Sequence, residues 1–208
     1  MIERTEVLPS YVGKKVCISG EILDIFNPDP INIDLIDIGW GLANQIRFGG
    51  QCLFPYSVGQ HSVLLSHMVP KHLAAVALMH DAAEAYVGDI ITPLKMLMPE
   101  FEVAEHKILR MIFEKFSTFH HTLDFDLMEE FKTYDLQICW HEAKTLQPFE
   151  TWTKDREVCP EVRAHSIEVW SPEKTRLLFF QRADELIPQK MSWVQRYALF
   201  CDSVGVKV

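Results

Sequence analysis

The segment LAAVALMHDAAEAYVGD, residues 73–89, joins an apolar run to a histidine and three carboxylates with no turn signal between them. The apolar part has the composition of a helix that is buried in a protein core. A carboxylate buried without a partner costs several kcal/mol of folding free energy, or its pKa shifts until it is neutral. The fold must therefore supply partners for the polar end of this segment, which carries His80, Asp81, Glu84 and Asp89.

Length and composition indicate a single globular domain. The chain has 208 residues, of which 48% are hydrophobic and 24% are charged, so it can bury a sizeable core without disulfides. Its formal net charge of −9 argues against a protein that binds nucleic acid through a general positive surface. A small phosphate would need a local group of positive charges or a metal ion to offset this charge.

Cysteine usage and hydropathy favour an intracellular protein. The five cysteines are scattered, and no CxxC pair is present, which is typical of reduced thiols rather than of a disulfide framework or a zinc knuckle. The start, MIERTEVLPS, lacks the apolar segment of a signal peptide. No run approaches the ~18 apolar residues of a membrane span. We therefore expect a soluble, cytoplasmic protein without a membrane partner.

The predicted fold is mostly α-helical with a small β-hairpin at the N-terminus. The stretch KKVCISGEILDIF alternates and is rich in β-branched residues, and the two prolines of NPDPIN end it. Beyond it, apolar residues recur at helical spacing. We expect helices over residues 34–47, 57–70, 71–86, 102–116, 124–146 and 172–186, and an irregular loop over 147–166.

The domain organisation follows from these elements. We expect one domain over residues 1–208, because the chain carries no internal repeat and no low-complexity linker. Within it, residues 1–32 form the hairpin appendage and residues 33–186 form the helical core.

The polar end of the buried helix predicts a metal site. His80 and Glu84 are four residues apart, and Asp81 and Glu84 are three apart, so the three side chains share one flank of a helix. Their mutual repulsion would raise the pKa of each carboxyl unless a cation lies among them. Imidazole and carboxylate ligands together suit a divalent transition metal, namely Mn, Fe, Co, Ni or Zn.

Two further ligands are predicted from the neighbouring helices. The short connection near Pro70 makes the two helices antiparallel, which brings His61 beside His80. Asp135 lies among apolar residues in FKTYDLQICWHEAKTL and needs a partner of its own. His61, His80, Asp81 and Asp135 would then bind one metal ion per chain and leave positions open for water or substrate. The alternatives are a metal-free core pair for His80 and Asp81 and a purely structural Asp135.

The ordered pattern H…HD…D resembles the HD-domain metal-dependent phosphohydrolases. The segments RFGG, YSVGQHSVLLS, ALMHDAAEAYVGDIITPLK and HEAKTL are similar to the bacterial and phage branch related to 5′-deoxynucleotidases, over roughly residues 14–185. An isolated HD dipeptide carries little weight, whereas the ordered set with HDxxExxxGDxxTPxK is specific. One departure is the interval of 19 residues from His61 to His80, which is shorter than in the well-known 5′-deoxynucleotidases.

The resemblance implies a fold and a role for each site residue. It implies an HD-domain helical bundle in which Arg47 contacts the substrate phosphate while Glu84 and Asp89 act beside the metal. Thr92 and Lys95, within the same motif, are further candidates for substrate contact. Other interpretations remain open: Glu84 could pair with Arg47, Asp89 could only shape the loop before Thr92, and Lys95 could be a solvated surface charge.

The leading functional hypothesis is an enzyme that releases phosphate from (deoxy)nucleoside 5′-monophosphates. Deoxynucleoside triphosphate triphosphohydrolase activity is the first alternative, and cyclic nucleotide hydrolysis is the second. A non-catalytic nucleotide-binding regulator is the alternative from another class, and the presence of both Glu84 and Asp89 argues against it. The expected partner is a small nucleotide rather than a nucleic acid polymer, and a homodimer or higher homo-oligomer stays open.

Overall fold

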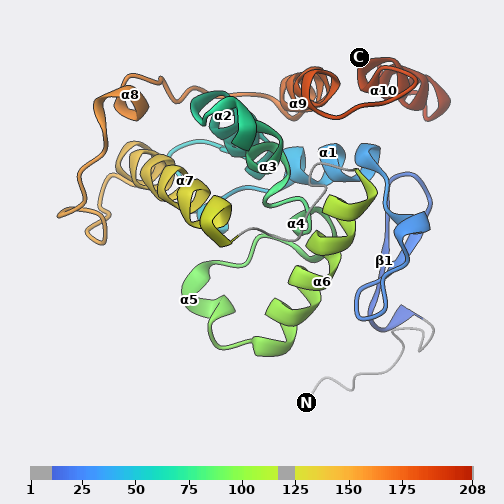
Figure 1. Ribbon diagram of the computed structural model, residues 1–208, viewed down its shortest axis with the longest axis horizontal. Coiled ribbons are helices and arrows are strands. Elements are labelled where there is room, and N and C mark those ends of the chain that lie inside the picture. The colour runs from blue at the N-terminus through green and yellow to red at the C-terminus, as the bar shows by residue number, and fades with distance from the viewer. Residues whose placement is uncertain (1–10, 117–124, 208) are drawn as a thin grey trace.

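The computed structural model describes residues 11–116 and 125–207, and the described chain is mostly helical (Figure 1). The predicted hairpin is confirmed: β1 (Lys14–Val16) pairs antiparallel with β2 (Ile22–Asp24). The turn between them contains Gly20 at a φ of 91°, a left-handed conformation that glycine adopts without steric cost. Leu23, fully buried on β2, anchors the hairpin to the helical core.

Several of the described helices begin at a side chain that caps them. The Asp34 carboxylate accepts from the amide of Ile36 before α1 (Leu35–Asn44), and the Ser57 hydroxyl caps α2 (Val58–Met68). Ser171 caps α9 (Pro172–Leu186), whose bounds agree with the predicted helix. Two other predicted helices correspond to α6 (Pro99–Lys115) and α7 (Phe125–Leu146). The expected start of the latter, Asp124, lies outside the described residues.

The prediction of a single helix over residues 71–86 is wrong. The segment forms a 3₁₀ turn η4 (Lys71–Leu73), then α3 (Ala74–Met79), a run of turns, and α4 (Glu84–Val87). Within the break, the amides of Ala82 and Glu84 bond to carbonyls three residues earlier, which is the tighter 3₁₀ pattern. The break matters for function because it contains His80 and Asp81.

The structure also contains elements that we did not predict. They are η2 (Pro30–Asn32), η3 (Phe48–Gly50), α5 (Thr92–Lys95), α8 (Pro160–Arg163) and α10 (Trp193–Ser203). The predicted last helix, α9, is thus followed by another. The buried residues of α10, namely Trp193, Tyr197 and Cys201, recur every four positions, which is a helical period visible in the sequence.

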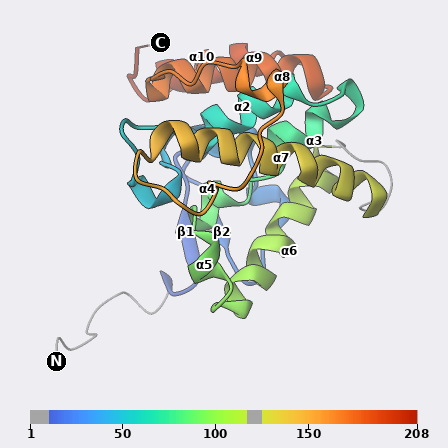
Figure 2. The same cartoon turned by 90° about the vertical axis from the view of Figure 1, so that its left-hand side faces the viewer.

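The helices pack around one hydrophobic core (Figures 1 and 2). α9 and α10 lie along one side, α1 packs between α9 and α4, and α2 packs against α3 and α7. Glycine permits the closest approach: a Cβ on Gly41 of α1 would lie 2.8 Å from the Cβ of Ala85. α4 therefore sits directly on α1, and this contact fixes the backbone beside Glu84. None of the helices described for residues 11–116 and 125–207 has the length and apolar character that a membrane crossing needs.

Candidate metal centre

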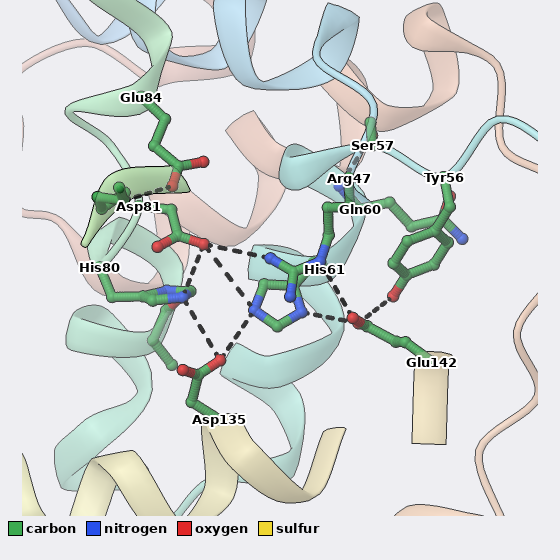
Figure 3. Close-up of polar contacts among 12 residues, drawn as sticks. Arg47, Tyr56, Ser57, Gln60, His61, His80, Asp81, Glu84, Asp135 and Glu142 are labelled. Carbon is green, nitrogen blue, oxygen red and sulfur yellow. Dashed lines mark hydrogen bonds and ion pairs between the residues drawn. The ribbon is translucent and has the colours of Figure 1, made fainter. Parts of the chain in front are cut away.

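The structure brings the four predicted ligands together (Figure 3). His61 comes from α2, His80 and Asp81 come from the break between α3 and α4, and Asp135 comes from α7. His61 Nε2 lies 3.2 Å from Asp135 Oδ1, and His80 Nε2 lies 2.9 Å from Asp81 Oδ2. The cross distances are 4.0 Å from His61 Nε2 to Asp81 Oδ2 and 3.8 Å from His80 Nε2 to Asp135 Oδ1.

The outer nitrogen of each imidazole is already bonded. His61 Nδ1 lies 2.7 Å from Oε1 of Glu142, and His80 Nδ1 lies 2.9 Å from the carbonyl oxygen of Ala77. With Nδ1 donating to these acceptors, both Nε2 atoms face the carboxylates of Asp81 and Asp135. Metal-binding histidines are oriented in this way, with the second ring nitrogen held by a carboxylate or a backbone carbonyl.

One buried atom supports a cation at this place. Nε2 of His61 is buried, and with the ring proton on Nδ1 it has no donor to accept from within the described part of the chain, because its polar neighbours are carboxylates. Donor atoms of His61, His80 and Asp81 all lie within 4.8 Å of one another, so one ion can reach all three. Asp135 adds a carboxylate on the α7 side. Two imidazoles and two carboxylates fit a divalent transition metal.

The electrostatics of these residues show strong mutual attraction. Burial and Arg47 lower the pKa of His61, but the carboxylates of Glu142 and Asp135 outweigh them and raise it to about 9. Burial alone would raise the pKa of Asp81, yet His80 and His61 hold it well below its usual range. Burial likewise opposes ionisation of Asp135, yet His61 and His80 lower its pKa. Both carboxylate ligands are therefore ionised at neutral pH, as metal binding requires.

Glu84 and Asp89 lie on the α4 side of the centre. Glu84 is 6% exposed, and its burial, together with Asp81 and Asp89, raises the pKa of its carboxyl well above the usual range. Burial also raises the pKa of Asp89. Lys95 Nζ lies 3.8 Å from Glu84 Oε1 and 2.8 Å from Glu105 Oε1, so it is not a solvated surface charge. Thr92 is exposed at the start of α5.

Arg47 is held next to the ligands rather than by Glu84. Its Nε lies 3.1 Å from Oε2 of Glu142, and its Nη1 lies 3.5 Å from Oδ2 of Asp81. The alternative pairing with Glu84 is therefore not the one that the structure contains. The Arg47 backbone is fixed as well, because its amide donates to the carbonyl of Tyr56 over 3.0 Å. Its side chain is 13% exposed, which leaves a small surface for a ligand.

Glu142 is a site residue that our sequence analysis missed. Its side chain is fully buried and contacts His61, Arg47 and the hydroxyl of Tyr56. A signal was present, because Glu142 follows Asp135 by seven residues, or two turns, and so lies on the same face of α7. A helix face that carries one predicted ligand, Asp135, and a second carboxylate, Glu142, predicts that both belong to the site.

The comparison with protein families addresses the same part of the chain. A family model described as "HD domain" matches residues 56–153. This segment is an HD domain. It contains the four candidate ligands and Glu142, whereas Arg47 precedes it. HD domains bind divalent metals, and the histidine–aspartate group fits that property.

Curated relatives of the HD domain were found in three bacteria. The chain is 48% identical to the uncharacterized protein YfdR of Escherichia coli over 93 residues, which cover 45% of this chain and 51% of YfdR. It is 38% identical to an uncharacterized protein of Rhodobacter capsulatus over 87 residues, 38% of this chain and 44% of the relative. It is also 38% identical to a 5′-deoxynucleotidase of Vibrio parahaemolyticus over 55 residues, 23% and 28% of the two chains. The matches thus span about half the length of these relatives, or less.

Proposed function

We propose that this chain is a metal-dependent phosphohydrolase that releases phosphate from (deoxy)nucleoside 5′-monophosphates. The observation that carries the proposal is the convergence of the His61 and His80 Nε2 atoms on the carboxylates of Asp81 and Asp135. The HD domain supports a hydrolase, and similarity to a 5′-deoxynucleotidase favours a nucleoside monophosphate as the substrate.

The four ligands would hold the metal at the end of α2, against α7. When bound there, a divalent metal would act as a Lewis acid toward the phosphoryl group and would lower the pKa of a bound water. The Nε2 atoms of His61 and His80 are available to bind the metal, because their Nδ1 atoms are bonded to Glu142 and to the Ala77 carbonyl.

Glu84 has the properties of a general acid. Its carboxyl is buried, its Oε2 has no hydrogen-bond partner among the described residues, and its raised pKa keeps a proton on it at higher pH than usual. A protonated carboxyl can donate to the leaving oxygen of a phosphoester. Asp89, whose pKa is raised by burial as well, would orient the attacking water. Lys95 lies against Glu84 and is positioned to stabilise negative charge that develops there.

Arg47 would bind the phosphate. Its guanidinium is fixed by two carboxylates and keeps some exposed surface, and a planar guanidinium matches phosphate oxygens through two parallel hydrogen bonds. Together with the metal, it would form a local positive site in a protein with a net charge of −9. Such a site accepts one small phosphate while the remaining surface repels polyanions.

An assay across substrates and metals tests this proposal. The four common deoxynucleoside 5′-monophosphates and their 5′-triphosphates are incubated with the protein and Mn²⁺, Co²⁺, Zn²⁺ or Mg²⁺ in turn. The proposal predicts orthophosphate from monophosphates. Release of tripolyphosphate from the triphosphates would contradict the proposal and support a triphosphohydrolase. Nucleotide binding without any product would contradict it and support a non-catalytic regulator.

A further inference from the structure

One buried carboxylate connects the metal side of the centre to the phosphate side. Glu142 Oε1 accepts from Nδ1 of His61 and from the hydroxyl of Tyr56, each over 2.7 Å. The other oxygen, Oε2, accepts from Nε of Arg47 over 3.1 Å. Figure 3 shows Glu142 between these groups, on the side of His61 opposite Asp81 and Asp135.

The contact with His61 determines which ring nitrogen can bind a metal. An ionised carboxylate only accepts hydrogen bonds, so Glu142 requires the proton of His61 to be on Nδ1. The lone pair of a neutral His61 is then on Nε2, which faces Asp81 and Asp135. A side chain able to donate at this place would permit the opposite tautomer and direct an N–H group toward the metal.

The contact with Arg47 fixes the direction of the guanidinium. Glu142 holds Nε, and the Nη1 atom is left to face Asp81, 3.5 Å away, which is toward the candidate metal. Because both oxygens belong to one rigid planar group, rotation of the carboxylate would disturb His61 and Arg47 together. Tyr56 limits that rotation through its bond to Oε1.

We propose that Glu142 is a positioning residue that aligns the metal ligand His61 with the phosphate-binding Arg47. The part that concerns Arg47 rests on the proposed function, and the part that concerns His61 needs only a bound metal. The alternative is a structural role, in which Glu142 only neutralises the charge of Arg47 in the protein interior. The two accounts differ in what they predict for metal affinity in a folded variant.

The variant Glu142→Gln tests the His61 part by Zn²⁺ binding. An amide of the same shape can donate to Nδ1, so we expect Zn²⁺ affinity, measured by competition with a chromogenic chelator, to fall about 10- to 100-fold. Asp37→Asn is the matched control, since Asp37 is a buried carboxylate bonded to Ser19 at the hairpin. It should lower thermal stability and leave Zn²⁺ affinity unchanged. Wild-type Zn²⁺ affinity in folded Glu142→Gln would overturn the proposal.

The Arg47 part is tested by kinetics at saturating metal. Once Glu142→Gln is fully loaded, the loosened guanidinium should raise KM for a nucleoside monophosphate about tenfold, while kcat changes less. An unchanged KM would remove Arg47 from the proposal. If the chain hydrolyses no nucleotide at all, the proposed function fails, whereas the Zn²⁺ result still decides the His61 part.

A measurement on the wild-type protein covers the case in which the variant does not fold. In Zn²⁺-loaded protein labelled with ¹⁵N at histidine, His61 should show a proton bonded to Nδ1 that is protected from exchange with solvent. A proton on Nε2 of His61 would contradict the proposed arrangement, because Glu142 would then not direct Nε2 to the metal.

Discussion

Nε2 of His61 lies 3.2 Å from Oδ1 of Asp135, and this contact joins α2 to α7 across the candidate metal centre. His80 makes the equivalent approach to Asp81 from the opposite side, over 2.9 Å. In both pairs the outer ring nitrogen is bonded elsewhere, so the inner nitrogen and the carboxylate face the same small volume. A divalent cation in that volume would reach donor atoms of His61, His80 and Asp81, and the Asp135 carboxylate lies beside it.

Metal content is the first prediction. Protein purified without chelator should contain about one transition metal per chain, and His61→Ala or Asp135→Ala should lose it, because each removes a direct ligand. Elemental analysis of the purified proteins measures this. His72→Ala is the control, since His72 is exposed and contacts only Glu130 in the described structure. Failure to find metal under any loading condition would refute the site.

The neighbourhood of His61 and His80 could be predicted from the sequence because the connection near Pro70 is short. An antiparallel pair of helices follows from that length, and the two ring centroids lie 5.2 Å apart. The sequence could not predict the break at residues 80–83. Helical periodicity continues through it, and the close packing of α4 on α1 at Gly41 and Ala85 is a long-range contact that this periodicity does not encode.

Side-chain partners were harder to predict than the elements. Arg47 was assigned to the site by resemblance, and its pairing with Glu142 and Asp81 depends on how the segment before α2 meets α7. That approach involves long-range backbone bonds, such as the one from the Leu53 amide to the Leu146 carbonyl. No local pattern in the chain encodes such contacts. The face shared by Asp135 and Glu142, in contrast, was available from spacing alone.

Glu84 should be needed for turnover and not for metal binding. Glu84→Gln keeps the shape of the side chain but cannot donate an acidic proton, so kcat should fall by about 100-fold or more. Metal content should equal that of the wild type, because no ligand is removed. Steady-state kinetics together with elemental analysis check both halves. A variant with normal kcat would exclude Glu84 from proton transfer.

Two substitutions of Arg47 distinguish its role in substrate binding from its role in stability. Arg47→Lys retains the charge beside Glu142 but loses the planar fork, so kcat/KM should fall about tenfold or more in a folded protein. Arg47→Ala also leaves the buried Glu142 carboxylate without its cation, which should lower the free energy of unfolding by about 3 kcal/mol. Kinetics and denaturant unfolding of both variants measure these effects. Wild-type kcat/KM in Arg47→Lys would argue that the phosphate binds elsewhere.

Metal affinity should depend on pH through His61. The pKa of this imidazole is raised to about 9, so at neutral pH the ring carries a second proton, on Nε2, in addition to the one on Nδ1. This second proton must leave when a metal binds. Apparent Zn²⁺ affinity should therefore rise with pH below that value, by up to about tenfold per pH unit for one displaced proton. Chelator competition at a series of pH values between 6.5 and 8.5 measures the slope. Constant affinity across this range would mean that His61 does not exchange a proton for the metal.

The most direct test of the account is phosphate release before and after metal removal. Wild-type protein is treated with a chelator, dialysed, assayed with a deoxynucleoside 5′-monophosphate, reloaded with the metal that it contained on purification, and assayed again, with His61→Ala carried in parallel. The account predicts that orthophosphate release is lost on removal, returns on reloading in the wild type, and does not return in His61→Ala. Release that persists in the stripped protein, or that returns equally in His61→Ala, would contradict it.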